Sequence, residues 1–492
     1  MEPTHGSLLR KTAKGTAWIV AWRMVTRLLG FASTLILVRV LSPGDFGLVA
    51  LATGFAQAIE GFSWLDVEDA VVREKAPTRE VYDTGFTMNV LRGLATGTAI
   101  AALAWPAGGF FAEPRVTPVL LVLAAATAAD GFLNIGIVDF RRDFAFDREF
   151  RLWILPRLAG TLVAITLVLT LATYWALVAG ILTTRVLRVA ASYLMHPYRP
   201  RFGLRAWDIL GNYSLWTWAL GLLTLLRDRA DSLILGRMLG TASVGVFSLA
   251  TEMAALPTTE LVEPMCRAAF SGFAAVRHAE LTPAETWQRM IATTAVVTLP
   301  AGLGIALVAV PFVALAFGPA WGAAVLPMRV LAVAGTVTVF GYVSATLFRT
   351  HGLMANAAGI MAGALLLRVA LLIGLTWRWG LPGAAIAVAV AIIVEQGGNV
   401  ARSCRQFHIP LRRLVGSIWR TLLASLGMAA AVLLAGPVGG PAWLMMAADV
   451  GLGVPSYAAL LGLLWLASGR PDGPEADMLA LARRFRRRDG TA

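Results

Sequence analysis

The stretch "LILVRVLSPGDFGLVALAT" (residues 35–53) recurs 198 residues later as "LILGRMLGTASVGVFSLAT" (residues 233–251). Nine of the nineteen positions are identical without a gap, and they include the arginine and the glycine at Arg39 and Gly47 of the first copy. Chance similarity between apolar sequences rarely aligns an arginine and a glycine together. We therefore interpret the match as a duplication within the chain.

The composition of the chain is that of a membrane protein. Of its 492 residues, 58% are hydrophobic and 14% are charged, with a mean hydropathy of +0.70, whereas soluble domains have about 25% charged residues. Apolar stretches of about 20 residues, the length that crosses a bilayer, recur along the sequence and predict an all-α polytopic membrane protein with about fourteen transmembrane helices. These are expected at 17–38, 47–65, 84–106, 117–138, 153–173, 175–195, 210–238, 243–264, 290–316, 323–348, 353–376, 380–401, 416–436 and 443–467.

The offset between the two copies equals six predicted helices. Because six is even, both copies enter the membrane in the same direction, which predicts a parallel repeat with a pseudo-twofold axis along the membrane normal. Paired lobes of this kind enclose a central site and act by alternating access, so the architecture favours transport. We expect a six-helix lobe with a cytoplasmic connector over 1–209, a second six-helix lobe over 210–402, two extra helices within 403–467 and a basic tail over 468–492.

The basic residues predict the orientation. With a cytoplasmic N-terminus, 30 of the 42 Lys and Arg residues fall on the inner side, including five arginines between residues 185 and 205. The outer connections, among them 318–322 and 437–441, plainly hold only Arg115 and Arg378. The positive-inside rule then places both termini in the cytoplasm. Orientation and contact with anionic lipids account for the net charge of +13, so no nucleic-acid partner is expected.

Three stretches of the sequence carry a resemblance to a known superfamily. They are "RVLSPGDFGLVALAT" (39–53), "DSLILGRMLGTASVGVFSLA" (231–250) and "FGPAWGAAVLPMRVLAVAG" (317–335). They resemble the polysaccharide flippases of the multidrug/oligosaccharidyl-lipid/polysaccharide exporter superfamily. The resemblance implies a multi-pass protein of the bacterial inner membrane that moves an undecaprenyl-diphosphate-linked oligosaccharide from the cytoplasmic to the periplasmic leaflet, for lipopolysaccharide or exopolysaccharide synthesis.

Arginines inside the predicted spans are the candidates for binding such a lipid. An ionisable side chain at the centre of a span costs at least about 2.5–3.5 kcal/mol, so it normally faces protein or a water-filled cavity. A guanidinium makes bidentate contacts to phosphate, and we expect these arginines to line the cavity and bind the diphosphate. The alternative is that each is tied to a neighbouring carboxylate or to lipid phosphate. The candidates are Arg23, Arg27, Arg92, Arg227, Arg229 and Arg368.

Four charges in "RDRAD" (227–231) interrupt the helix predicted over 210–238. In register with the first copy they fall in the middle of a helix, and the alternative is an outer loop between two shorter helices. On a helix, residues four apart share a face. We therefore expect Arg227 to pair with Asp231 and Arg229 to point away, without a carboxylate partner.

Acidic residues within or at the ends of spans are candidates for carrying a coupled proton or sodium ion. Apart from such an ion, we expect no cofactor, and no metal site is indicated because Cys266 and Cys404 lie far apart and outside any CxxC pair. The candidates for ion coupling are Asp130, Asp228, Asp231, Glu252 and Glu395.

Three other functions compete with the polysaccharide flippase. A membrane glycan polymerase would need a long outer loop for its chemistry, and the longest predicted outer connection has about ten residues, so we do not expect an enzyme. A multidrug or cation exporter would favour a carboxylate-rich cavity, whereas the buried set here is mainly arginine. A flippase for a peptidoglycan lipid precursor fits the chemistry nearly as well. We expect a monomer that contacts anionic lipids and the polymerase and export machinery of the same pathway.

Overall fold

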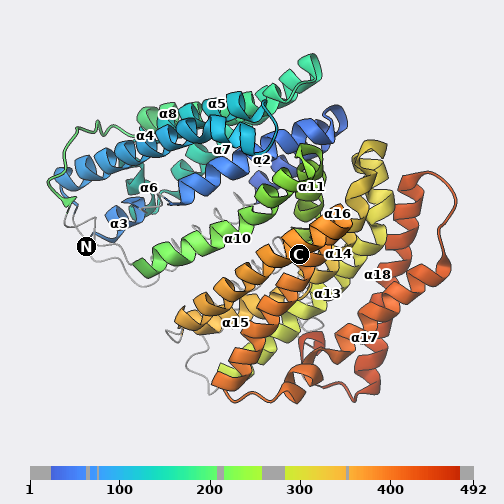
Figure 1. The fold of residues 1–492 in the computed structure, drawn as a ribbon. Helices are drawn as coiled ribbons and strands as arrows, with labels where there is room; N and C mark the ends of the chain where they lie inside the picture. The colour runs from blue at the N-terminus through green and yellow to red at the C-terminus, as the bar shows by residue number, and fades with distance from the viewer. Residues whose placement is uncertain are drawn as a thin grey trace, which may run out of the picture. The chain divides into compact units, whose positions relative to one another are not determined.

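A computed structural model gives the fold of the protein and describes residues 24–62, 67–74, 77–207, 215–257, 283–350, 354–471 and 473–476. The chain divides into two compact units, residues 1–245 and 246–492, and each is a bundle of helices (Figure 1). Within the described ranges there is no β-strand, and the predicted all-α polytopic fold is confirmed. The predicted lobe boundaries at 209, 402 and 467 stay a prediction.

The first unit is built around two pairs of long helices that are joined by short turns. α4 packs against α5, α7 packs against α8, and α5 also contacts α8 and α2. The elements are a helix over 24–40, α2 (Pro43–Phe62), α3 (Val67–Arg73), α4 (Arg79–Phe110), α5 (Val116–Asp130), η1 (Ile135–Ile137), α6 (Val138–Arg142), α7 (Phe146–Leu171), α8 (Trp175–Met195), α10 (Leu215–Leu239) and the start of α11 (Thr241–Pro257).

The motif "SPGDFG" (42–47) starts α2. The Ser42 hydroxyl accepts a hydrogen bond from the Asp45 backbone N–H at 3.1 Å and donates one to the Asp45 carboxylate at 2.8 Å. This is the reciprocal arrangement of a helix N-cap, and Pro43 occupies the first helical position, where a missing N–H costs nothing. The polar residues of the motif therefore define where α2 begins.

Three glycines at intervals of seven residues let α10 lie close along α2. Gly47 lies against the backbone of Thr241 and Gly245, Gly54 faces Ser232 and Arg229, and Gly61 faces Leu225. Successive glycines along α2 contact progressively earlier residues of α11 and α10, so α2 and α10 run antiparallel. Small residues at such spacing allow close backbone approach in membrane helices. We call this contact the glycine seam; all its residues belong to the first unit.

The second unit is arranged around α13 (Pro283–Ala316), which contacts α14, α15, α17 and α18. The "FGPAW" element forms the turn after α13, because Gly318 adopts a φ of 87° that favours glycine and Trp321 is buried. The remaining helices are η4 (Pro319–Ala324), α14 (Val325–Gly335), α15 (Thr338–Thr350), α16 (Met354–Gln406), α17 (Leu411–Ala435) and α18 (Ala442–Ala467).

Within the described residues, each predicted span corresponds to a helix or to part of a bent helix pair, and two spans are bent. Residues 17–23, 63–65, 210–214, 258–264 and 353 of the predicted spans lie outside the described residues. The span predicted over 117–138 is wrong in its second half, because α5 ends at Asp130 and the chain bends by 67° into η1 and α6. Spans 353–376 and 380–401 correspond to the two parts of α16, which is kinked at Gly380 with φ 60°, so the break falls where it was predicted. The span predicted over 323–348 is α14 and α15, bent by 41°. Among the described helices, seven are long and apolar enough to cross a bilayer, or nine with the bent pairs.

Three hydrogen bonds hold the segment 196–207 against α4. This segment follows directly after α8. The backbone N–H groups of Arg201, Gly203 and Ala206 donate to Asp83, Thr87 and Thr84 of α4 at 2.8, 2.9 and 3.1 Å. At its start, the ring of His196 contacts Asp139 of α6, with 3.3 Å between Nε2 and Oδ2. The beginning of the connector is therefore an ordered part of the first unit.

Candidate functional site

Six polar residues from four helices meet inside the first unit, and we call them the arginine–carboxylate cluster. Five of them, with Gly93, Thr96 and Gly131, line a cavity of about 110 Å³. The sixth, Arg188, contacts the cluster through Asp130. The members are Glu60 of α2, Arg92 of α4, Thr127 and Asp130 of α5, and Arg185 and Arg188 of α8.

Arg185 ties three helices together at the centre of the cluster. Its Nη1 donates to Glu60 Oε1 at 3.0 Å and to Thr127 Oγ1 at 2.7 Å, and the Thr127 hydroxyl donates to the same Glu60 oxygen at 2.6 Å. Its Nε lies 3.5 Å from Asp130 Oδ2. Because the guanidinium is planar and carries five donors, one arginine can serve all three acceptors.

Asp130, the last residue of α5, is held by two arginines of α8. Arg188 Nη2 lies 2.5 Å from Asp130 Oδ2, and the Arg188 guanidinium also stacks over the ring of Trp153, 4.9 Å from its centroid. Asp130 Oδ1 is buried and has no hydrogen-bond partner among the described residues. The helix α5 therefore ends on an ion pair that leaves one carboxylate oxygen unused.

Arg92 gives the cluster an excess of positive charge. It lines the same cavity, and within the described part of the chain its buried Nε has no hydrogen-bond partner. Three guanidinium groups thus meet two carboxylates in a largely apolar bundle, which leaves one positive charge without a carboxylate among the described residues. Such a site attracts an anion rather than a cation.

The "RDRAD" residues lie inside α10, so the alternative of an outer loop between two helices is wrong. Arg227 Nε lies 3.0 Å from Asp228 Oδ1, and Asp231 is buried on the same helix. The pairing of Arg227 with Asp231 stays a prediction. The buried Nε of Arg229 has no hydrogen-bond partner among the described residues, and the side chain of Arg229 faces Gly54 in the glycine seam.

The other predicted site residues are distributed over several elements. Arg23 lies outside the described residues, and Arg27 lies on the exposed side of the helix over 24–40. In the second unit, Arg368 and the buried Glu395 belong to α16, while Glu252 is an exposed residue of α11. Among the predicted binding arginines that the structure describes in the first unit, Arg92 is the one that lines the cluster cavity.

Sequence reasoning missed the two arginines that organise the cluster. We counted Arg185 and Arg188 among the inner connections, but both lie within α8, more than two turns after its start. The sequence did contain a sign of their role, because Arg185 and Arg188 lie inside a predicted span and, three residues apart, share one face of the helix. Glu60 was missed too, since nothing in the sequence connects it with the end of α5.

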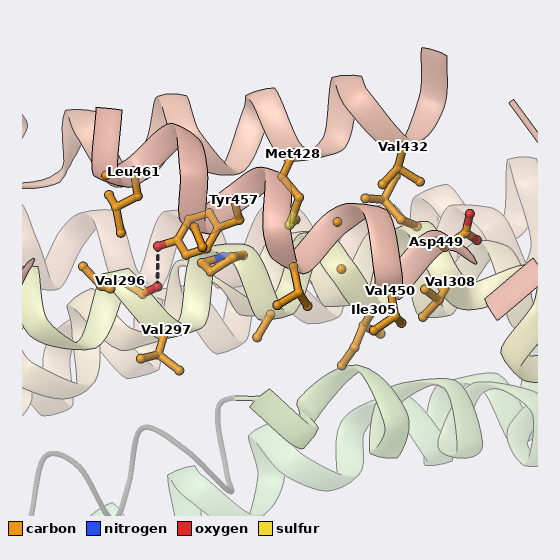
Figure 2. A pocket seen from close by; sticks show the side chains of 18 of the residues that line it. Val296, Val297, Ile305, Val308, Met428, Val432, Asp449, Val450, Tyr457 and Leu461 are labelled. Carbon is orange, nitrogen blue, oxygen red and sulfur yellow. Dashed lines mark hydrogen bonds between the residues drawn. The ribbon is translucent and has the colours of Figure 1, made fainter. Parts of the chain in front are cut away.

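The second unit contains a separate apolar groove between α13, α17 and α18, with a volume of about 760 Å³. Figure 2 shows Tyr457 pointing toward α13, where its hydroxyl donates to the Val296 carbonyl at 2.6 Å. Asp449 lies at the opposite end of the groove from Leu461. Asp449 also lines an adjoining cavity of about 900 Å³, together with Arg329 of α14. We call the two hollows together the C-terminal groove.

Comparison with known proteins gives relatives in polysaccharide biosynthesis. The chain is 22% identical over 429 residues to the lipopolysaccharide biosynthesis protein WzxC of Escherichia coli (strain K12), covering 85% of each chain. It is also 22% identical over 329 residues to the succinoglycan biosynthesis transport protein ExoT of Rhizobium meliloti (strain 1021), covering 65% of each.

Solved structures show the same fold. The lipid II flippase MurJ in an inward closed conformation matches with a TM-score of 0.75 at 12% identity, over 92% of this chain and 99% of that one. An inward-facing multidrug resistance MATE family transporter of the MOP superfamily matches with a TM-score of 0.58 at 17% identity, over 77% and 94%. The family described as "Polysaccharide biosynthesis protein" matches residues 36–326, more than half of the chain, and the protein therefore belongs to that family, in agreement with the predicted resemblance.

Proposed function

We propose that the protein is a flippase that moves a polyprenyl-diphosphate-linked oligosaccharide from the cytoplasmic to the periplasmic leaflet by alternating access. The observation that carries the proposal is the arginine–carboxylate cluster, whose excess positive charge lies inside an apolar bundle. Family membership and the names of the relatives support a role in the synthesis of lipopolysaccharide or exopolysaccharide. The undecaprenyl carrier and the direction of movement are parts of the proposal.

Arg92 and Arg229 are the first residues to test for binding the diphosphate. Each has a buried Nε that no described residue uses, so each can donate to a phosphate oxygen without breaking an existing hydrogen bond. Arg185 and Arg188 have a different role, because their carboxylate partners already hold them; they fix the shape of the cavity. Arg23, Arg27 and Arg227 in the first unit and Arg368 in the second are further candidates.

The test is translocation of a fluorescent undecaprenyl-diphosphate oligosaccharide by the purified protein in liposomes. Replacing Arg92→Gln or Arg229→Gln removes one charged hydrogen-bond donor and should slow translocation about tenfold or more. Arg378→Gln is the matched control, because Arg378 is exposed in α16 and should leave the rate unchanged. Parental rates in the Arg92→Gln/Arg229→Gln double variant would contradict the proposal.

The same assay separates the competing substrates. A flippase for a peptidoglycan lipid precursor would move lipid II faster than the polysaccharide repeat unit. A cation exporter would move neither lipid and would instead accumulate a cationic dye. The net positive charge of the cluster argues against the cation exporter.

Coupling to a proton or a sodium ion is a further part of the proposal. Asp130 is the carboxylate best placed for it, because it belongs to the cluster and keeps one oxygen without a partner among the described residues. We expect translocation to accelerate under a pH or sodium gradient in the parent protein and to lose this response in Asp130→Asn. If the parent protein translocates at the same rate with and without either gradient, ion coupling is no longer part of the proposal.

A further inference from the structure

Two opposite charges share one wall of the C-terminal groove. Arg329 of α14 and Asp449 of α18 line the same cavity of about 900 Å³, and the rest of its lining is almost entirely apolar. Arg329 Nε donates to the Ala306 carbonyl at 3.1 Å, which leaves its two terminal nitrogens for another acceptor. Among the described residues, none donates a hydrogen bond to Asp449 or forms an ion pair with it. Asp449 is also the only charged residue of α18.

The two charges lie at similar depths. Arg329 is four residues after the start of α14 and Asp449 is seven after the start of α18, or about 6 and 10 Å along the helix axes at 1.5 Å per residue. Both helices follow connections that the charge distribution assigns to the outer side. With the orientation predicted from the charge distribution, both charges lie toward the outer ends of their helices, and the apolar part of the groove continues inward from them.

The apolar part of the groove is shaped for a hydrocarbon chain. Beyond Asp449 it continues along α18 past Gly453 to Leu461, and Figure 2 shows valine and isoleucine side chains of α13 and α18 along this path. The one hydroxyl on this path, that of Tyr457, is already bonded to the Val296 carbonyl. The indole N–H of Trp465 and the carboxylate of Glu475, which also line the groove, are bonded to the Pro471 carbonyl and to Arg420. Among the described residues, the polar groups free to bind a ligand therefore lie at the mouth.

We propose that the C-terminal groove binds a zwitterionic aminophospholipid of the phosphatidylethanolamine type. Its phosphate lies on Arg329, its ammonium group on Asp449, and one acyl chain lies along α18. Charge complementarity selects this class of ligand: a diphosphate lipid would meet repulsion from Asp449, and a cationic ligand would meet repulsion from Arg329. The site does not depend on which substrate the protein transports.

The test uses the full chain in nanodiscs made of phosphatidylethanolamine and phosphatidylglycerol at equal amounts. After delipidation in detergent, native mass spectrometry counts the lipids that stay bound. The parent protein should retain phosphatidylethanolamine. Arg329→Gln should reduce the retained lipid about tenfold, while Asp449→Asn should remove the preference for phosphatidylethanolamine over phosphatidylglycerol. Arg378→Gln is the control and should behave like the parent protein.

A second variant tests the groove without touching its charges. Gly453 has space for a Cβ, because the nearest side-chain atom, in Val432, would lie 3.6 Å away. Gly453→Leu should therefore fill the path of the acyl chain and reduce the amount of lipid retained. A thermal-shift assay should show that this variant stays folded. Equal retention in all variants, a parental preference for phosphatidylglycerol, or a polyprenyl diphosphate as the retained species would each overturn the proposal.

Discussion

At the scale of single residues, His196 makes a prediction about pH. Burial lowers the pKa of His196, and this effect outweighs the opposite one of the neighbouring Asp139. The unfolded chain, with a pKa of about 6.5, then binds the proton more readily than the folded protein. The stability that neutral His196 contributes should therefore be fully present above pH 6.5, and the free energy of unfolding should decrease as the pH falls below 6.5.

The measurement is the melting temperature of the purified protein between pH 7.5 and pH 5.5. In His196→Gln the melting temperature should decrease less steeply with falling pH than in the parent protein. His408→Asn is the control, because His408 is exposed in the connection between α16 and α17. Parallel curves of melting temperature against pH for the parent protein and His196→Gln would show that His196 does not contribute to the pH dependence of stability.

Residue roles were predictable only where they depend on local sequence. Arg92 and Arg229 were recognisable from the sequence because a charged side chain inside an apolar span is costly and normally faces protein or a water-filled cavity. The contact of Arg227 with its sequence neighbour Asp228 was not predicted, because helical spacing points only to Asp231, whereas the side-chain conformation of Arg227 brings its Nε to Asp228. The contact between Glu60 and Arg185 joins residues 125 positions apart, and no periodicity within one helix could reveal it.

At the scale of elements, the glycine seam predicts a graded series of effects. A Cβ on Gly47 would overlap the backbone of Thr241, which cannot move aside, whereas a Cβ on Gly61 would meet only the flexible end of Leu225 and one on Gly54 would make an ordinary contact at 3.7 Å. Overpacking costs about 1–3 kcal/mol, which corresponds to a loss of about 2–4 °C per kcal/mol in a unit of this size.

We therefore expect Gly47→Ala to lower the melting temperature by several degrees, and Gly54→Ala to leave it nearly unchanged. Gly245→Ala should match Gly47→Ala, because its Cβ would meet the Pro43 carbonyl. Thermal unfolding of the four proteins in one detergent is sufficient to check this. Equal melting temperatures would mean that the close approach of these backbones is not needed for stability.

Elements were predicted well where hydropathy alone defines them, and less well where a turn depends on tertiary contacts. The helix predicted over 117–138 failed because most of its residues are apolar and its few polar residues do not mark a turn. The bend after α5 is fixed by Asn134, which caps η1 and donates to the carbonyl of Tyr198 at 2.8 Å. By contrast, the kink at Gly380 falls where the sequence already predicted a break, since the segment "WRWGLPG" (377–383) combines glycines with a proline.

At the scale of the whole molecule, the repeat was the most informative feature of the sequence. Gly47 and Gly245 occupy equivalent positions of the two copies, and in the structure their backbones touch. The duplication inferred from nineteen aligned positions thus has a structural counterpart at the start of α2 and α11.

The orientation of the chain gives the last prediction. The structure moves Arg185 and Arg188 from the inner connections into α8, and it pairs Arg420 with the buried Glu475 at 2.9 Å, so these three arginines no longer count as topogenic charges. The remaining inner excess still favours cytoplasmic termini. We expect alkaline phosphatase fused after Ala112, in the turn between α4 and α5, to be active, and the same enzyme fused after His408 to be inactive. Green fluorescent protein at the C-terminus should fluoresce. Activity after His408 together with a dark C-terminal fusion would reverse the orientation, and the direction of transport would then have to be assigned again.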